Sequence, residues 1–136
     1  MRTMLILLAG LVATPVLAAP VFAAPRAAKV AAPHPGEAVY QNVCQACHMA
    51  NAKGGEGAGR IPALAGNAAL EDADYPILVV TGGKGAMPWF RGDLTDQQIA
   101  DVVSYVRSHF NKYKGSVTAA KVAEVGVPAP KGGSER

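Results

Sequence analysis

Two cysteines separated by two residues and followed at once by a histidine place the tightest constraint on this chain. The run is Cys44-Gln45-Ala46-Cys47-His48. A Cys-x-x-Cys-His sequence is typical of covalent haem attachment, in which both thiols form thioethers with the haem vinyl groups. His48 would then be held under the iron and would supply one axial nitrogen. The motif therefore predicts a fold built around one covalently bound haem c.

Composition agrees with a small haem domain. The motif contains both cysteines of the 136-residue chain, so haem attachment would leave no thiol for a disulfide. The 13 Lys and Arg against 10 Asp and Glu give a mildly basic chain, which is too weakly charged to indicate a nucleic-acid partner. The hydrophobic core that so short a chain can bury is small. A buried porphyrin would add apolar contact that the side chains alone cannot supply.

Residues 1–23 have the pattern of a secretory signal peptide. An apolar stretch at residues 5–13 is followed by small-residue cleavage patterns that end at Ala18 and Ala23. We expect cleavage after Ala23, with Ala18 as the alternative. An uncleaved membrane anchor is disfavoured, because prolines interrupt the apolar run and it is shorter than the roughly 20 residues that a span needs. The sequence thus predicts a periplasmic protein with no stable membrane span after signal cleavage.

The remaining chain divides into three parts. Residues 24–35 are rich in Pro and Ala and predict a linker, in which His34 would be solvated. Residues 36–112 form the predicted haem domain. Residues 113–136 are predicted to be a C-terminal tail, partly disordered, with a short helix capped by Thr118.

The first half of the haem domain combines a helix with irregular chain. Residues 37–44 predict a short helix that leads directly into the haem motif. The glycine-rich residues 51–59 predict a loop close to a haem edge, and a phosphate-binding loop is disfavoured because the Gly-Lys-Ser/Thr ending is absent. Residues 61–66 predict a buried extended segment, and residues 67–70 predict one helical turn.

Two further helices complete the predicted all-α fold. Asp74 is expected to cap a helix that ends at a glycine, although the apolar residues 77–80 would also suit a strand. Residues 94–110 form the clearest helix, since Thr95 and Gln98 fit a capping box. Its apolar stripe comprises Ile99, Val102, Val103, Val106 and Phe110, and its polar face comprises Gln97, Asp101, Ser104 and Ser108.

A haem iron with one histidine needs a further ligand if its sixth position is to be closed. The candidates are Met49, Met87, His34 and His109. Met49 follows the haem motif directly and cannot reach the opposite haem face. Met87 lies far along the chain in a loop of glycines stiffened by Pro88, which suits a ligand that must approach the haem plane. We predict that Met87 is the second axial ligand, and His109 is expected to interact with the C-terminus of its helix or with water.

Other side chains are candidates for contacts around the haem. The Pro62 carbonyl would accept the second ring N–H of His48, unless Pro62 is an ordinary loop proline. Trp89 and Tyr75 are expected to pack on or near the porphyrin. Three basic residues would form a docking rim or would simply be solvated: Lys53, Lys84 and Arg91.

The motif, the methionine loop and the final amphipathic helix together resemble a bacterial class I c-type cytochrome over residues 36–112. The resemblance implies a fold in which N- and C-terminal helices cross around the haem. The Gly-x-x-x-aromatic pattern of the first helix in that family is matched by Gly36 and Tyr40. The matching contacts on the last helix would be Val102 and Tyr105. The family's proline that contacts the haem histidine matches Pro62, and residues 117–123 are similar to haem-domain ends in cytochrome subunits of periplasmic dehydrogenases.

These features predict a periplasmic electron-transfer protein rather than an enzyme, because a six-coordinate iron has no free position for a substrate. The alternative is an electron-acceptor subunit of a periplasmic dehydrogenase or oxidase. Expected partners are redox proteins: a dehydrogenase, a cytochrome complex or a terminal oxidase. A thiol–disulfide oxidoreductase would need a βαβ context, and a haem sensor or peroxidase would need an open sixth position.

Overall fold

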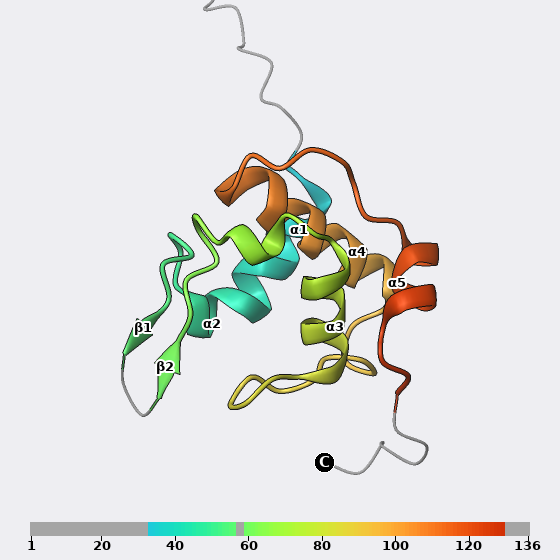
Figure 1. Cartoon of the computed structure of the whole chain (residues 1–136), viewed down its shortest axis with the longest axis horizontal. Coiled ribbons are helices and arrows are strands. Elements are labelled where there is room, and N and C mark those ends of the chain that lie inside the picture. Colours follow the sequence, from blue (N-terminus) through green and yellow to red (C-terminus); the bar gives the residue numbers. More distant parts are fainter. Residues whose placement is uncertain (1–32, 57–58, 130–136) are drawn as a thin grey trace, which may run out of the picture. The chain divides into compact units, whose positions relative to one another are not determined.

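The computed structural model describes residues 33–56 and 59–129. In that part the chain is dominated by helices, and the only strands form one short antiparallel pair (Figure 1). The predicted all-α fold is confirmed. The elements are α1 (Pro35–Val39), π-helical η1 (Tyr40–Cys44), α2 (Gln45–His48), β1 (Gly55–Glu56), β2 (Arg60–Ile61), 3-10 η2 (Ala68–Leu70), α3 (Asp74–Gly82), α4 (Asp96–Tyr105), π-helical η3 (Val106–Phe110) and α5 (Ala119–Val125).

The predicted signal peptide lies outside the described residues, and so does nearly all of the predicted linker. Within the described ranges, no helix has both the length and the apolar character needed to cross a lipid bilayer.

The first helix begins inside the predicted linker. Pro35 is its first residue, where a missing backbone N–H costs no helical hydrogen bond. The His34 Nδ1 atom accepts a hydrogen bond from the Gly36 N–H at 3.1 Å, and the His34 ring centroid lies 5.5 Å from that of Tyr105. The prediction of a solvated His34 is therefore wrong, because this ring caps a helix and packs against another aromatic ring.

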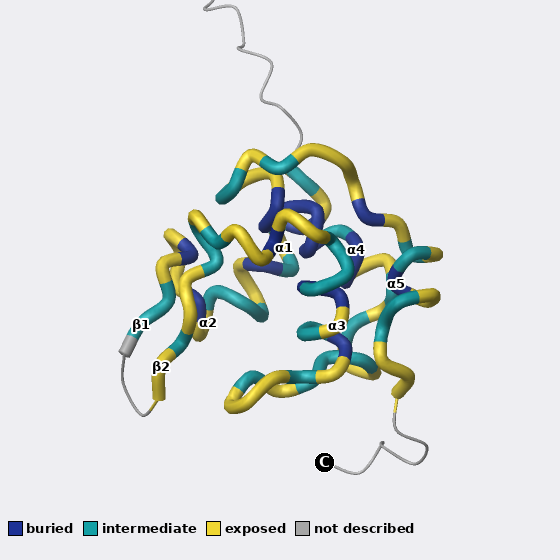
Figure 2. The backbone as a smooth tube through the Cα atoms, in the orientation of Figure 1, coloured by how far each residue is buried: buried dark blue, intermediate teal, exposed yellow. Residues whose placement is uncertain are grey.

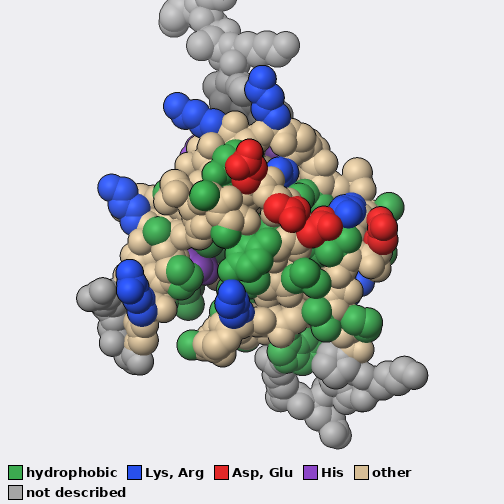
Figure 3. All heavy atoms as spheres, in the orientation of Figure 1, with side chains coloured by type: hydrophobic (Ala, Val, Ile, Leu, Met, Phe, Trp, Pro, Cys, Tyr) green, Lys and Arg blue, Asp and Glu red, His purple; other side chains and the backbone are tan. Residues whose placement is uncertain are grey.

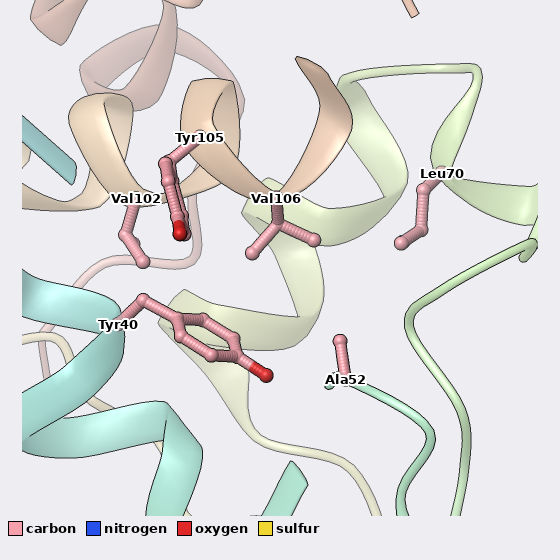
Figure 4. Packing of buried hydrophobic residues seen from close by; sticks show 6 residues of the cluster. All are labelled: Tyr40, Ala52, Leu70, Val102, Tyr105 and Val106. Atoms are coloured by element: carbon pink, nitrogen blue, oxygen red, sulfur yellow. The ribbon is translucent and has the colours of Figure 1, made fainter. Parts of the chain in front are cut away.

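Helices α1 and α4 cross at very close range. A Cβ atom on Gly36 would collide with the backbone of Asp101 and Val102, so only glycine allows this approach. One turn further on, the buried Tyr40 ring lies 5.7 Å from the Tyr105 ring. Figure 4 shows the Tyr105 side chain extending from α4 toward Tyr40. The crossing implied by the family resemblance is thus present, with the expected residues at the contact.

Helix α4 begins and packs largely as its sequence predicts. Thr95 Oγ1 accepts the Gln98 N–H at 3.2 Å and Gln98 Oε1 accepts the Thr95 N–H at 2.9 Å, which completes the capping box. Ser104 was predicted on the polar face, but it is only 6% exposed. The prediction is wrong because the Ser104 hydroxyl accepts the Val117 N–H at 2.8 Å from the segment that follows the helix. The stripe residues Ile99, Val102, Val103 and Val106 are buried.

Helix α3 confirms the helical interpretation of the apolar run at residues 77–80. The prediction that Asp74 caps this helix is wrong. The N-terminal capping residue is Ala73, and Asp74 already lies in the first turn. The Asp74 N–H donates to the Asp72 carboxylate at 3.0 Å, while the Asp74 carboxylate pairs with Lys121 at 3.1 Å. An acidic first turn still stabilises the positive end of the helix dipole.

The C-terminal segment is part of the packed structure. Thr118 caps α5 as predicted, since its hydroxyl accepts the Lys121 N–H at 3.2 Å. Val117 and Val122 are buried in a cluster with residues of α3 and α4, and Figure 2 shows the buried part of the tube at this contact. The folded region thus extends past residue 112, and residues 130–136 lie outside the described part.

Replacing Gly36 by alanine should destabilise the protein by about 1–3 kcal/mol, as is usual for overpacked contacts. The added methyl group would push apart two helix backbones, which cannot move as a flexible side chain can. Denaturant unfolding measures the loss. Gly59→Ala is the control, because its Cβ would meet nothing within 4 Å. Equal stability of Gly36→Ala and wild type would contradict the close crossing.

Candidate haem site

One large cavity brings the chemically distinctive side chains together. Its volume is about 770 Å³, within the range of roughly 300–1,000 Å³ that is usual for ligand sites. Its lining residues come from α2, the β1–β2 pair, α3, the loop after α3, and α4. Figure 1 shows α2 and the β1–β2 pair on one side of the molecule and α3 on the other. Five predicted site residues line this one space: Cys44, Cys47, His48, Pro62 and Met87.

His48 is buried in the cavity wall in a state suited to metal binding. Its Nδ1 lies 3.1 Å from the Pro62 carbonyl oxygen. A carbonyl can only accept, so Nδ1 carries the proton and the lone pair of Nε2 is left for a metal. Burial lowers the pKa of His48, and the hydrogen bond to Pro62 opposes this in part. The neutral imidazole is therefore the favoured form, and the predicted contact with Pro62 is present.

Hydrogen bonds to backbone carbonyls hold the segment of Pro62 against the haem motif. The Tyr40 hydroxyl donates to the Met49 carbonyl at 2.7 Å, which fixes the turn directly after His48. The carbonyl of the fully buried Ala52 accepts the N–H groups of Leu64 and Ala65, at 2.7 and 2.9 Å. Figure 4 shows the Tyr40 hydroxyl end directed toward Ala52. The predicted glycine-rich loop thus connects the two partners of the His48–Pro62 hydrogen bond.

The cysteines lack the environment of a redox-active thiol pair. Cys44 is partly buried at the end of η1 and Cys47 is exposed, and neither is in a disulfide. Burial raises the pKa of Cys44 to about 11. Reactive thiols have lowered pKa values instead. Both residues also lie in a helical run rather than in a βαβ unit, which disfavours thiol–disulfide exchange as the function.

Met87 is carried by a tight turn after α3. The Lys84 N–H donates to the Met87 carbonyl and the Met87 N–H to the Lys84 carbonyl, both at 3.0 Å. Gly83 and Gly85 have φ angles of 74° and 60°, which glycine adopts without strain. The glycines of this loop are therefore required by its backbone, and the turn presents Met87 to the cavity.

The two aromatic residues that were expected to pack near the porphyrin, Tyr75 and Trp89, are placed differently. Tyr75 and Phe90 line the cavity, and sequence reasoning did not single out Phe90. Trp89 is half-buried but is not among the lining residues, and a Cβ on Gly92 would lie 3.5 Å from its ring. Its haem contact remains a prediction.

The basic residues near the cavity differ from the predicted set. Lys84 and Arg60 line the cavity, and the Lys84 ammonium donates to the Tyr75 hydroxyl at 3.0 Å. Figure 3 shows hydrophobic side chains gathered at the centre of this face, with Lys and Arg side chains to their left and below. Arg91 does not belong to such a rim, because its side chain is only 16% exposed and pairs with Asp96 at 3.3 Å.

The other candidate ligands are placed differently from Met87. His34 and His109 do not line the cavity. His109 is exposed in the last turn of η3, as expected for a residue at the helix C-terminus or in water, and its ring also stacks on Tyr105 with 4.7 Å between centroids. Met49 lines the cavity but is 43% exposed and follows His48 directly.

Sequence reasoning missed the buried Arg107. Its guanidinium donates to the carbonyls of Leu70, Glu71 and Gly115, at 3.0, 2.9 and 3.0 Å. Leu70 is also part of the cavity wall. A basic residue late in an amphipathic helix gives no local signal of burial, because its carbonyl partners come from distant segments.

The residues of the cavity fit a haem. Two thiols next to a neutral imidazole can attach and ligate the group, and a thioether lines the same space. The walls are mainly apolar, which suits a porphyrin. The charged residues that line the described cavity are the basic Arg60 and Lys84, which would complement haem propionates.

Comparison with known proteins agrees with this geometry. Residues 31–106 match the family model described as cytochrome c oxidase, cbb3-type, subunit III. The chain belongs to this family. It is thus a class I c-type cytochrome, and proteins of this class bind haem c covalently and transfer electrons.

Similar proteins include subunits of larger enzymes and small cytochromes. The chain is 33% identical to the fructose dehydrogenase cytochrome subunit of Gluconobacter japonicus over 105 residues, which cover 66% of the chain and 21% of that protein. It is 34% identical to the cytochrome c subunit of the quinone alcohol dehydrogenase of Gluconacetobacter polyoxogenes over 116 residues, 73% and 24% of the two lengths. It is 40% identical to cytochrome c6 of Leptolyngbya boryana over 72 residues, 52% and 85%. The chain therefore spans about a quarter or less of the dehydrogenase subunits.

The buried Tyr40 hydroxyl predicts a loss of stability at high pH. Burial raises the pKa of Tyr40 from 10.0 to about 12, so the neutral phenol is favoured in the folded state. This contribution is complete below pH 10 and is lost as the pH rises toward 12. The free energy of unfolding should fall over that interval, and it should fall less in Tyr40→Phe. Denaturant titrations at several pH values measure this, and identical slopes in both proteins would contradict the assignment.

Proposed function

We propose that this cytochrome transfers single electrons through a haem attached at Cys44 and Cys47, with His48 and Met87 as axial ligands. The observation that carries the proposal is that all four side chains line one mainly apolar cavity. When bound, the haem iron supplies a one-electron couple between its ferric and ferrous states.

The chain's own residues would set the properties of that couple. His48 is oriented by its hydrogen bond to Pro62, which also increases the electron donation of its free nitrogen. A thioether from Met87 would favour the ferrous state and raise the reduction potential. The apolar side chains from α3 and α4 would keep water from the iron, and Arg60 and Lys84 would offset propionate charge.

We further propose that the protein is an electron carrier without catalytic activity of its own. With His48 and Met87 both bound, the iron would have no position for a substrate. The similarity to cytochrome c6 supports a carrier of small size. The predicted signal peptide supports a periplasmic location, where its partners would be dehydrogenases, cytochrome complexes or terminal oxidases.

The alternative function, an electron-acceptor module of a periplasmic dehydrogenase, has a specific observation in its favour. Several relatives are described as cytochrome subunits of fructose, alcohol and gluconate dehydrogenases. Affinity purification of the tagged protein under native conditions separates the two proposals. Stoichiometric co-elution with a catalytic subunit would contradict a free shuttle, and elution alone would contradict the module.

Met87→Ala should remove the weak ferric absorbance band near the red that marks a sulfur–iron bond. It should also lower the reduction potential, because a ligand that favours ferrous iron is lost. Absorbance spectra and a redox titration of the purified protein measure both. Met49→Ala is the matched control, since Met49 lines the cavity but cannot reach the opposite haem face. An unchanged band in Met87→Ala would rule out its assigned role.

A further inference from the structure

The loop that carries Met87 has two stems. It leaves helix α3 after Thr81 and Gly82, and it returns to regular contacts at Phe90 and Arg91. The stems are joined by one backbone hydrogen bond, from the Phe90 N–H to the Val80 carbonyl at 2.9 Å. A bond of this kind contributes about 1 kcal/mol, so further contacts at the stems would add appreciably to the stability of the loop.

The C-terminal segment contacts the first stem. The Val127 N–H donates to the Thr81 hydroxyl at 2.9 Å, and that hydroxyl is fully buried and donates in turn to the Ile77 carbonyl at 2.7 Å. The Val127 side chain packs on Gly82, where an added Cβ would lie 2.8 Å from a valine methyl group. The last residue of α3 before the loop is thus in contact with the segment that follows α5.

Helix α5, which leads into this segment, contacts the second stem. The Arg91 guanidinium donates to the Val122 carbonyl at the C-terminal end of α5, at 3.2 Å. Between the two contacts lies Gly126, where a Cβ would collide with the Arg91 guanidinium and lie 2.9 Å from the Thr81 methyl group. Gly126 therefore lies next to both stems, and a side chain at this position would have to displace the Arg91 guanidinium or the Thr81 methyl group.

We propose that Val122, Gly126 and Val127 form a C-terminal bracket that holds both stems of the Met87 loop and sets how readily Met87 leaves the iron. The proposal rests on Met87 being the second axial ligand. Arg91 is then a positioning residue, which acts through the loop rather than on the haem. The bracket lies outside residues 31–106, which match the family model.

Imidazole binding to the ferric protein tests the bracket, because imidazole can enter only when Met87 has left the iron. Two variants weaken one contact each. Arg91→Met removes the donor to Val122, and a chain ending at Gly126 loses Val127 while keeping all of α5. Each should raise the observed binding rate about fivefold, the factor expected for one lost hydrogen bond. The red absorbance band should weaken in parallel.

Matched controls separate the bracket from general loss of stability. Asp96→Asn removes the ion pair of Arg91 but keeps the donor to Val122, and Glu124→Gln changes an exposed residue of α5. Both should bind imidazole at the wild-type rate. Val39→Ala removes packing at the other end of the core, so it should lower the free energy of unfolding without raising the rate. Equal rates in the bracket variants and in wild type, or equal increases in Val39→Ala, would overturn the proposal.

Met87→Ala in the same assay distinguishes failure of the C-terminal bracket from failure of the assignment of Met87 as the axial ligand. Rapid imidazole binding together with loss of the red band keeps Met87 as the ligand, and unchanged bracket variants would then refute the bracket alone. A wild-type rate and an intact band in Met87→Ala would refute the ligand assignment, and the bracket would fail with it.

Discussion

The crossing of α1 and α4 at Gly36 is the contact on which the rest of the structure depends. Helix α1 leads without interruption into η1 and α2, so its position fixes where the haem motif lies. Helix α4 supplies the opposite wall of the cavity through its valines. Because the two backbones approach closely at Gly36 and are locked by the Tyr40–Tyr105 ring contact, the motif and this wall have a fixed separation.

The two proposed iron ligands are supported in different ways. His48 lies in a helix, is buried, and is oriented by the Pro62 carbonyl, whose own segment is tied to Ala52. Met87 lies in a turn that is closed by its own backbone and held at its stems. A rigid first ligand and a second ligand on a supported loop would allow the potential and the access to the iron to be adjusted without disturbing haem attachment.

Much of the fold could be predicted because the signals are local. The capping box of Thr95 and Gln98 and the cap at Thr118 depend on neighbours in sequence, and both are present. The predictions for His34, Asp74 and Ser104 were wrong because each side chain finds its environment in tertiary contacts or in local backbone geometry that a residue type does not specify. Ser104, for example, is polar but buried because the Val117 N–H reaches it.

The sequence by itself predicted covalent haem attachment, since the thiols and the imidazole that this requires are contiguous in the chain. The sequence also indicated which methionine could reach the haem face opposite His48. The glycines around Met87 allow a turn of the backbone that few other residues permit. Only the tertiary structure decided that Arg107 is buried, that Arg91 faces Val122 rather than solvent, and that the C-terminal segment packs against both stems of the methionine loop. These contacts join residues about thirty to forty-five positions apart, and their energy comes from backbone carbonyls and hydroxyls that become partners only when the helices have packed.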